Sequence, residues 1–141
     1  MIDIQNRIIE VLTLGKIMSL ATVDEGGPWA ADLIYIHDDQ LRLYWISRKT
    51  RRHSVALRNN SSVACSITVS QTNAPDLGLQ IAGHARELLS PPRIAKKYWI
   101  KRGAPPKQPI TDEHAWYQLA PTKIELIDEA SSQHEKKILE L

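Results

Sequence analysis

Apolar and polar residues alternate along several stretches of the chain, which is the pattern of strands buried on one face. Short turns rich in Asp, Gly and Asn separate the first of these stretches. Six strands are predicted, over residues 16–23, 28–36, 41–47, 62–70, 77–89 and 115–128, the last with a break at Pro121. Short connections imply antiparallel pairing, and six strands with few edges indicate a small closed barrel.

Three helices are predicted beside the strands, over residues 3–14, 51–58 and 91–102. Ser90 is the expected cap of the last helix, with Pro91 in its first position and Gly103 at its end. Gly83, inside the fifth strand, indicates a bulge or a close approach of another backbone. The polar tail over residues 129–141 ends in apolar residues that favour a short docking helix.

Composition limits the class of protein. With 141 residues, 43% hydrophobic and 24% charged, we expect one globular domain: a helix at 3–14, a barrel over about 16–128, and the tail. The formal net charge of +2 argues against a general binder of nucleic acid or membranes. No apolar run approaches the ~20 residues of a membrane span. The single cysteine, Cys65, is expected in the core, and a cytoplasmic location fits a chain without disulfides.

One basic cluster lies where the third strand passes into the short helix. It consists of Ser47, Arg48, Lys49, Thr50, Arg51, Arg52 and His53. The first N–H groups of a helix lack internal partners, and the helix dipole adds partial positive charge there. With Thr50 as the expected N-cap, the cluster predicts a phosphate site. The alternative is a solvated basic turn.

Four segments, in order, resemble the pyridoxamine 5′-phosphate oxidase-like proteins. They are SLATVDEGGPWAADLIYIHDD at 19–39, LYWISRKTRRHSVALRNNSSVAC at 43–65, LQIAGHAREL at 79–88 and WYQLAPTKIELID at 116–128. The resemblance runs from about residue 18 to residue 128. It implies a mainly β fold with flanking helices, a six-stranded antiparallel split β-barrel that binds FMN.

The resemblance also implies where FMN would lie, at the interface of a homodimer. The isoalloxazine ring would contact two backbone segments, the phosphate would lie on the basic cluster, and the partner subunit would add three residues. The ring would contact the backbone of Trp29, Ala30, Ala31, Asp32 and Leu33 and that of Trp45, Ile46 and Ser47. The phosphate would lie on Thr50, Arg51 and Arg52, with His53 beside them. The partner subunit would add Leu79, Gln80 and Trp116.

The chain also departs from the oxidase itself. Ala30 and Tyr35 stand where the oxidase has further cations, and the closing strand lacks its substrate-binding Arg and His pair. The absence of that pair argues against pyridoxamine 5′-phosphate oxidase activity. We therefore expect an FMN-dependent oxidoreductase with an unknown small substrate, and no residue stands out as catalytic. The histidines are scattered, so no metal site is predicted.

Two other functions compete with this one. The first is a non-enzymatic sensor or carrier of flavin, haem or deazaflavin, in which His53 or His84 would be the candidate haem ligand. The second is nucleic-acid binding through RKTRRH at residues 48–53, which predicts strong salt dependence. The short basic cluster and the mixed charge elsewhere disfavour the second.

Overall fold

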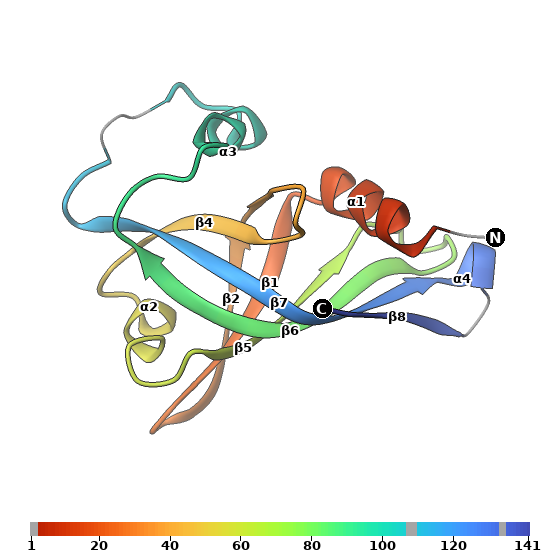
Figure 1. Ribbon diagram of the computed structural model, residues 1–141, viewed down its shortest axis with the longest axis horizontal. Helices are drawn as coiled ribbons and strands as arrows, with labels where there is room; N and C mark the ends of the chain where they lie inside the picture. The colour runs from red at the N-terminus through yellow and green to blue at the C-terminus, as the bar shows by residue number, and fades with distance from the viewer. Residues whose placement is uncertain (1–2, 107–109, 133–134) are drawn as a thin grey trace.

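A computed structural model describes residues 3–106, 110–132 and 135–141. The described residues form one strongly curved antiparallel sheet in the order β2-β1-β5-β6-β7-β4-β3, with β8 added beside β7 (Figure 1). Its strands are β1 Ile17–Asp24, β2 Gly27–Ile34, β3 Ile36–His37, β4 Leu43–Arg48, β5 Ser62–Thr68, β6 Leu77–Leu88, β7 His114–Asp128 and β8 Lys136–Glu140. The helices are α1 Ile4–Leu14, α2 Arg52–Ala56, α3 Ala95–Arg102 and α4 Glu129–Ser132.

The predicted mainly β, split-barrel fold is confirmed. All six predicted strands are present, and the structure adds the short β3 and the C-terminal β8. Within the described residues no ladder joins β2 to β3, so the sheet is a half-barrel with two edges rather than the closed cylinder that the strand count indicated. No helix in these described ranges is long and apolar enough to cross a membrane.

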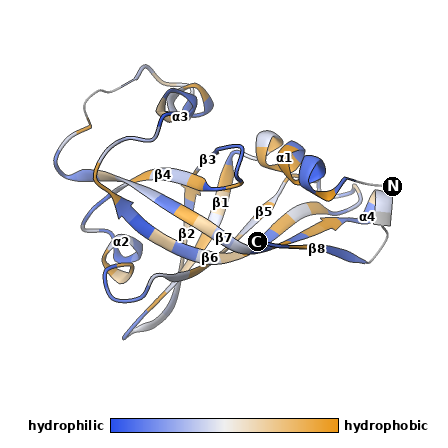
Figure 2. Ribbon diagram, in the orientation of Figure 1, coloured by the Kyte–Doolittle hydropathy of each residue, from blue (hydrophilic) through white to orange (hydrophobic). Residues whose placement is uncertain are grey.

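The main core lies between α1 and the inner face of the sheet. Along β1 and β5 the buried and exposed residues alternate, which is why the sequence pattern located these strands. The buried side of α1 adds Ile8, Val11 and Leu12 to this core. Figure 2 shows apolar segments on α1 and along the strands. Burying each such side chain contributes about 1.5–3 kcal/mol. Cys65 lies in this core, as predicted.

A second, aromatic core lies beneath α3. Its buried members come from β3, β4, α3 and β7: Ile36, Tyr44, Ala95, Tyr98, Trp99 and Trp116. The helix begins at Ala95 and not at Pro91, so the prediction of Ser90 as its cap was wrong. The segment before it forms a turn instead, in which the Ala95 N–H donates to the Pro92 carbonyl at 3.1 Å. Gly103 ends the helix as predicted, with φ of 73°.

The ladder between β6 and β7 contains the predicted irregularity at Gly83. The register shifts between Ala82 and Gly83, opposite Pro121. A Cβ atom on Gly83 would collide with the backbone of Ala120 and Pro121, so the strands approach closely only because the residue is glycine. Pro121 does not break β7, because it lies at this bulge.

The tail forms β8 where a docking helix was predicted. Leu139 pairs with Ile124 of β7 and packs against the main core. β4 pairs with β7 only as far as Leu119, so residues 123–127 of β7 have a free edge for β8. The pairing of such distant segments decided the structure, and the helical prediction for the tail was wrong.

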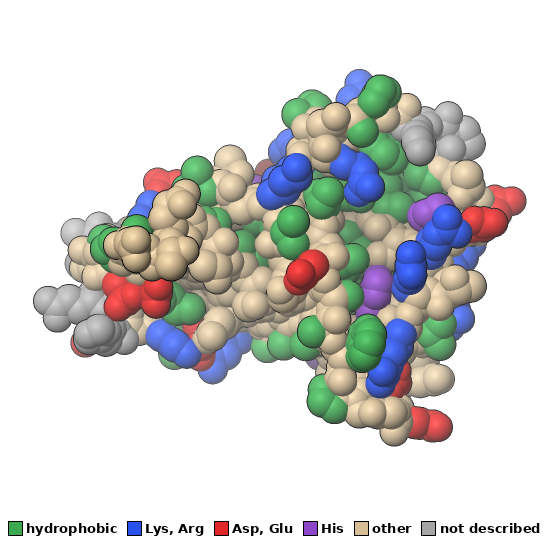
Figure 3. Space-filling model, turned by 180° about the vertical axis from the view of Figure 1, so that it is seen from behind, with side chains coloured by type: hydrophobic (Ala, Val, Ile, Leu, Met, Phe, Trp, Pro, Cys, Tyr) green, Lys and Arg blue, Asp and Glu red, His purple; other side chains and the backbone are tan. Residues whose placement is uncertain are grey.

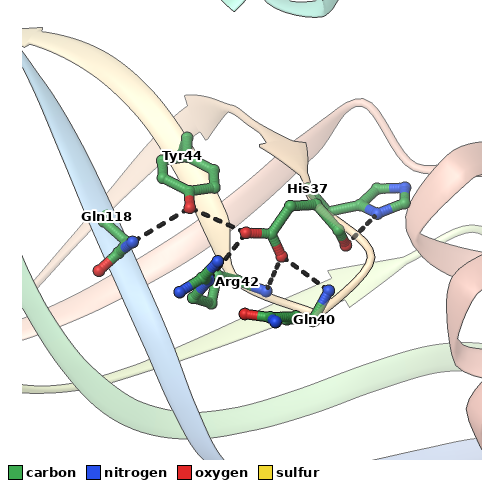
Figure 4. Close-up of polar contacts among 6 residues, drawn as sticks. His37, Gln40, Arg42, Tyr44 and Gln118 are labelled. Atoms are coloured by element: carbon green, nitrogen blue, oxygen red, sulfur yellow. Dashed lines mark hydrogen bonds and ion pairs between the residues drawn. The ribbon is translucent and has the colours of Figure 1, made fainter. Parts of the chain in front are cut away.

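The turn between β3 and β4 is held by the Asp38 carboxylate. Its Oδ1 accepts hydrogen bonds from the backbone N–H groups of Gln40 and Arg42, both at 3.0 Å (Figure 4). Leu41, between them, has φ of 65°, a left-handed conformation that is rare for a residue with a side chain. Its side chain is buried in the main core. The carboxylate and the core contact together hold Leu41 in this strained conformation.

The other oxygen of Asp38 connects this turn to β7. Oδ2 accepts from the Arg42 Nε at 2.8 Å and from the Tyr44 hydroxyl at 2.9 Å. The Tyr44 hydroxyl accepts in turn from Nε2 of Gln118 at 3.0 Å. Burial alone would raise the pKa of Asp38, but the hydrogen bonds from Arg42 and Tyr44 outweigh it and leave the pKa lowered.

Candidate functional site

The predicted basic cluster forms an exposed corner where β4 leads into α2. Thr50 and Arg51 are exposed there, and Arg52 is half-buried. The helix begins at Arg52, and the residue before it, Arg51, makes no capping hydrogen bond through its side chain. Thr50 lies outside the helix, so the prediction that it caps the helix was wrong. The corner's chemistry therefore depends on its side-chain cations.

Arg52 is fixed in place by the hairpin between β1 and β2. Its Nε and Nη2 donate to the two carboxylate oxygens of Asp24, at 2.8 and 2.9 Å. Its Cζ lies 4.4 Å from the centre of the Trp29 ring, which is 45% exposed. The hydrogen bond from Arg52 lowers the pKa of Asp24. This geometry leaves the Nη1 edge of a fixed guanidinium for an anion.

Some of the other cations at the corner have no carboxylate partner in the described part of the chain. Arg48 pairs with Glu113 at 2.9 Å, whereas Lys49, Arg51 and Arg58 form no such ion pair. In Figure 3, Lys and Arg side chains lie beside histidine and apolar side chains on the same side of the molecule as α2. The corner therefore has excess positive charge, as a phosphate site requires.

His53 is buried behind the corner. Its side chain hydrogen-bonds through Nε2 with the Ser47 hydroxyl at 2.9 Å. Burial, and then the charge of Arg51, lower the pKa of His53, so the neutral ring is favoured. Ser47 and His53 both lie at the corner, as predicted. Their side chains bond to each other, however, and support the corner from inside.

The predicted residues of β2 divide between its two faces. Trp29 lies against Arg52, whereas Ala30 lines a groove of about 490 Å³ on the outer face of the sheet. Gln80 of β6 lines the same groove. Asp32 accepts a hydrogen bond from the Ser19 hydroxyl across the β1–β2 ladder at 2.6 Å. Ala31 and Leu33 are half-buried. The fold thus brings Ala30 and Gln80 together in one groove, whereas Trp29 lies with the corner on the other face of β2.

Three of the predicted contacts have side chains that point into the protein. Trp45 is fully buried and stacked on Tyr117, with ring centres 5.8 Å apart, and Leu79 is buried in the main core. Trp116 is buried edge-to-face against Tyr98 and borders a cavity of about 590 Å³. Ile46 is half-buried against the aromatic core. Trp45 and Leu79 can offer a ligand only backbone groups.

Sequence reasoning missed two partners at these sites. Asp24 was assigned only to a hairpin turn, and nothing local links it to Arg52, which lies 28 residues away. Lys136 of β8 donates to the Gln80 side chain at 2.8 Å and to Glu125 at 3.2 Å. Its position depends on β8, a strand that was predicted as a helix.

The sequence matches the family model for pyridoxamine 5′-phosphate oxidase over residues 4–128. A UPF0306 protein of Pasteurella multocida (strain Pm70) is 33% identical over 86 residues, 60% of this chain and 58% of that protein. General stress protein 26 of Bacillus subtilis (strain 168) is 27% identical over 100 residues, 71% of this chain and 70% of that protein. The Pasteurella match therefore spans less than two thirds of that relative.

Solved structures share the fold at low sequence identity. General stress protein 26 of Bacillus anthracis str. Sterne superposes with a TM-score of 0.78 and 17% identity, covering 99% of this chain and 100% of that one. A FAD-binding protein of Mesorhizobium loti superposes with a TM-score of 0.64 and 20% identity, covering 84% of this chain and 90% of that one. HutZ, the haem storage protein of Vibrio cholerae, superposes with a TM-score of 0.64 and 16% identity, covering 96% of this chain and 92% of that one.

Proposed function

Because this chain belongs to the pyridoxamine 5′-phosphate oxidase family, we propose that it is an FMN-binding flavoprotein and a flavin-dependent oxidoreductase for a small substrate. The main support is the Arg52 guanidinium, held by Asp24 and stacked on the exposed Trp29 ring. A phosphate needs fixed, charge-assisted donors of this kind. Arg51 adds an exposed cation beside it.

The chain's own residues would bind and orient the cofactor, which supplies the redox chemistry when bound. Arg51 and Arg52 would hold the phosphate, with Thr50 offering a hydroxyl. The Trp29–Leu33 and Trp45–Ser47 backbones would hold the ring. We propose a homodimer in which Gln80 of the partner subunit completes the site. No residue is proposed as a general acid or base.

The phosphate assignment is tested by titrating the protein with FMN and with riboflavin, which lacks the phosphate. Replacing Arg51 and Arg52 together by Ala should weaken FMN binding by at least roughly 100-fold, because each charge-assisted contact contributes about 1.5–3 kcal/mol. Riboflavin binding should change little. The control is Arg86→Ala, an exposed arginine on β6 outside the corner. Equal FMN affinity in the double variant and the wild type would contradict the site.

Haem is the alternative ligand, and one observation favours a particular residue for it. His84 is exposed on β6 and bonds to the Ser61 hydroxyl through Nδ1 at 3.1 Å, so Nε2 faces no partner within the described residues. His53 is a poorer haem ligand because it is buried and its Nε2 is engaged. If haem is the ligand, the wild type should give a haem absorption band that His84→Ala loses. A wild type that binds FMN and not haem would rule out this alternative.

A further inference from the structure

We infer that the cavity between the β3–β4 turn and the segment before α3 is a second ligand site, distinct from the proposed flavin site. It would bind a small organic acid that carries a hydrogen-bond donor on an apolar body. The cavity measures about 490 Å³, which is within the usual range of small-molecule sites. Its lining combines Tyr44, Gln118, Arg42 and Arg93 with the apolar Leu88 and Ile94. None of the residues assigned to the flavin lines it.

The buried polar chain in its wall has a fixed direction. The pKa of Asp38 is lowered, so its carboxylate is ionised and only accepts hydrogen bonds. The Tyr44 hydroxyl must therefore donate its single proton to Asp38, and it can only accept from Gln118. This requirement orients the Gln118 carboxamide with Nε2 toward Tyr44.

Gln118 consequently presents its carboxamide oxygen to the ligand. Its side chain is about nine-tenths buried and lines the cavity, and its oxygen has no hydrogen-bond partner within the described residues. Figure 4 shows this oxygen turned away from Tyr44. An acceptor held in one orientation at the wall of a cavity is suited to a hydroxyl or amino group on a ligand.

Arg93 supplies the cation of the site. It is exposed at the cavity and forms no ion pair in the part of the chain that the structure describes. The two acidic residues of the lining, Asp38 and Asp39, act on Arg42, whose pKa is raised by the hydrogen bond to Asp38 and by both charges. Arg93 is therefore the cation of the lining whose charge no carboxylate of the described residues offsets, and it is the one assigned to a ligand carboxylate. Leu88 and Ile94 would contact the apolar body between the two polar ends.

The experiment uses 6-hydroxy-2-naphthoate as a fluorescent probe, which combines a carboxylate, an apolar body and a hydroxyl donor. We expect saturable binding to the 141-residue chain, equal with and without FMN. Naphthol, which lacks the carboxylate, should bind at least roughly tenfold more weakly. Absence of saturable probe binding, or displacement of the probe by FMN, would overturn the proposal.

Two variants test the assigned partners. Arg93→Gln should weaken probe binding by roughly tenfold, whereas Lys96→Gln, which removes an exposed cation of α3 outside the cavity lining, should leave it unchanged. The wild type should prefer 6-hydroxy-2-naphthoate to 2-naphthoate, and Gln118→Leu should remove this preference. The variant should still bind 2-naphthoate, and this binding shows that it is folded. Equal probe binding by Arg93→Gln and the wild type would overturn the site, as would an unchanged preference in Gln118→Leu.

Discussion

Two carboxylate–guanidinium pairs in this protein share the same Nε–Oδ2 distance but have different surroundings. Asp38 binds the Arg42 Nε at 2.8 Å, and Asp24 binds the Arg52 Nε at 2.8 Å. Asp38 is buried and also accepts two backbone N–H groups and the Tyr44 hydroxyl. Asp24 is half-exposed and holds a cation that keeps donors free. The same pair thus shapes a turn at one place and positions a ligand-binding cation at the other.

The largest expected difference is in stability at the Asp38 turn. Asp38→Ala should lower the free energy of unfolding by about 3–5 kcal/mol, because it leaves buried donors unpaired and removes the support of the strained Leu41. Urea denaturation measures this change. Asp39→Ala, an exposed neighbour, should stay within about 0.5 kcal/mol of the wild type. A similarly small loss for Asp38→Ala would show that the turn does not need the carboxylate.

Tyr44→Phe should have a smaller effect on the same network. Losing the hydroxyl leaves the buried Gln118 amide without its acceptor, which is expected to cost about 1–2 kcal/mol of unfolding free energy. Tyr98→Phe is the matched control, because among the described residues the Tyr98 hydroxyl accepts a hydrogen bond from the exposed Arg102 and makes no other. Equal effects of the two substitutions in urea denaturation would argue against a directed chain from Asp38 to Gln118.

The Asp24–Arg52 pair should contribute little to stability. A double-mutant cycle with Asp24→Ala and Arg52→Ala is expected to give a coupling energy of about 0.5–1 kcal/mol, because both side chains are about one third exposed. Thermal or urea unfolding of the four proteins measures the coupling. A coupling above about 2 kcal/mol would indicate that this pair is as structural as the Asp38 network.

The smallest expected effect is a pH dependence due to His53. Its pKa is lowered in the folded protein by burial, so the unfolded chain binds the proton more readily. The stability that neutral His53 provides is therefore complete above the ordinary pKa of 6.5 and is lost as the pH falls through the lowered folded value. Comparing urea unfolding at pH 7 and pH 5.5, His53→Gln should lose less stability than the wild type. His37, whose pKa burial also lowers, should keep part of the dependence. Identical losses in variant and wild type would contradict the assignment.

Much of the fold was predictable because its signals are local. Alternation located the six long strands, and Gly83 and Gly103 marked the bulge and the helix end. The start of α3 was misplaced because Ser90 and Pro91 match a common helix start, but the chain turns through Pro92 instead. The tail was misassigned because an isolated apolar ending does not reveal the free edge of β7.

The sequence by itself determined the alternation that buries one face of each strand, the concentration of cations at residues 48–52, and the family to which the chain is similar. Only the tertiary structure decided which partners those cations have. Asp24 reaches Arg52, and Gln118 reaches Tyr44, across 28 and 74 residues of chain. The reason is physical: periodicity and capping depend on neighbours within a few residues, whereas the orientation of a guanidinium or a carboxamide depends on groups that only the folded sheet brings within 3 Å.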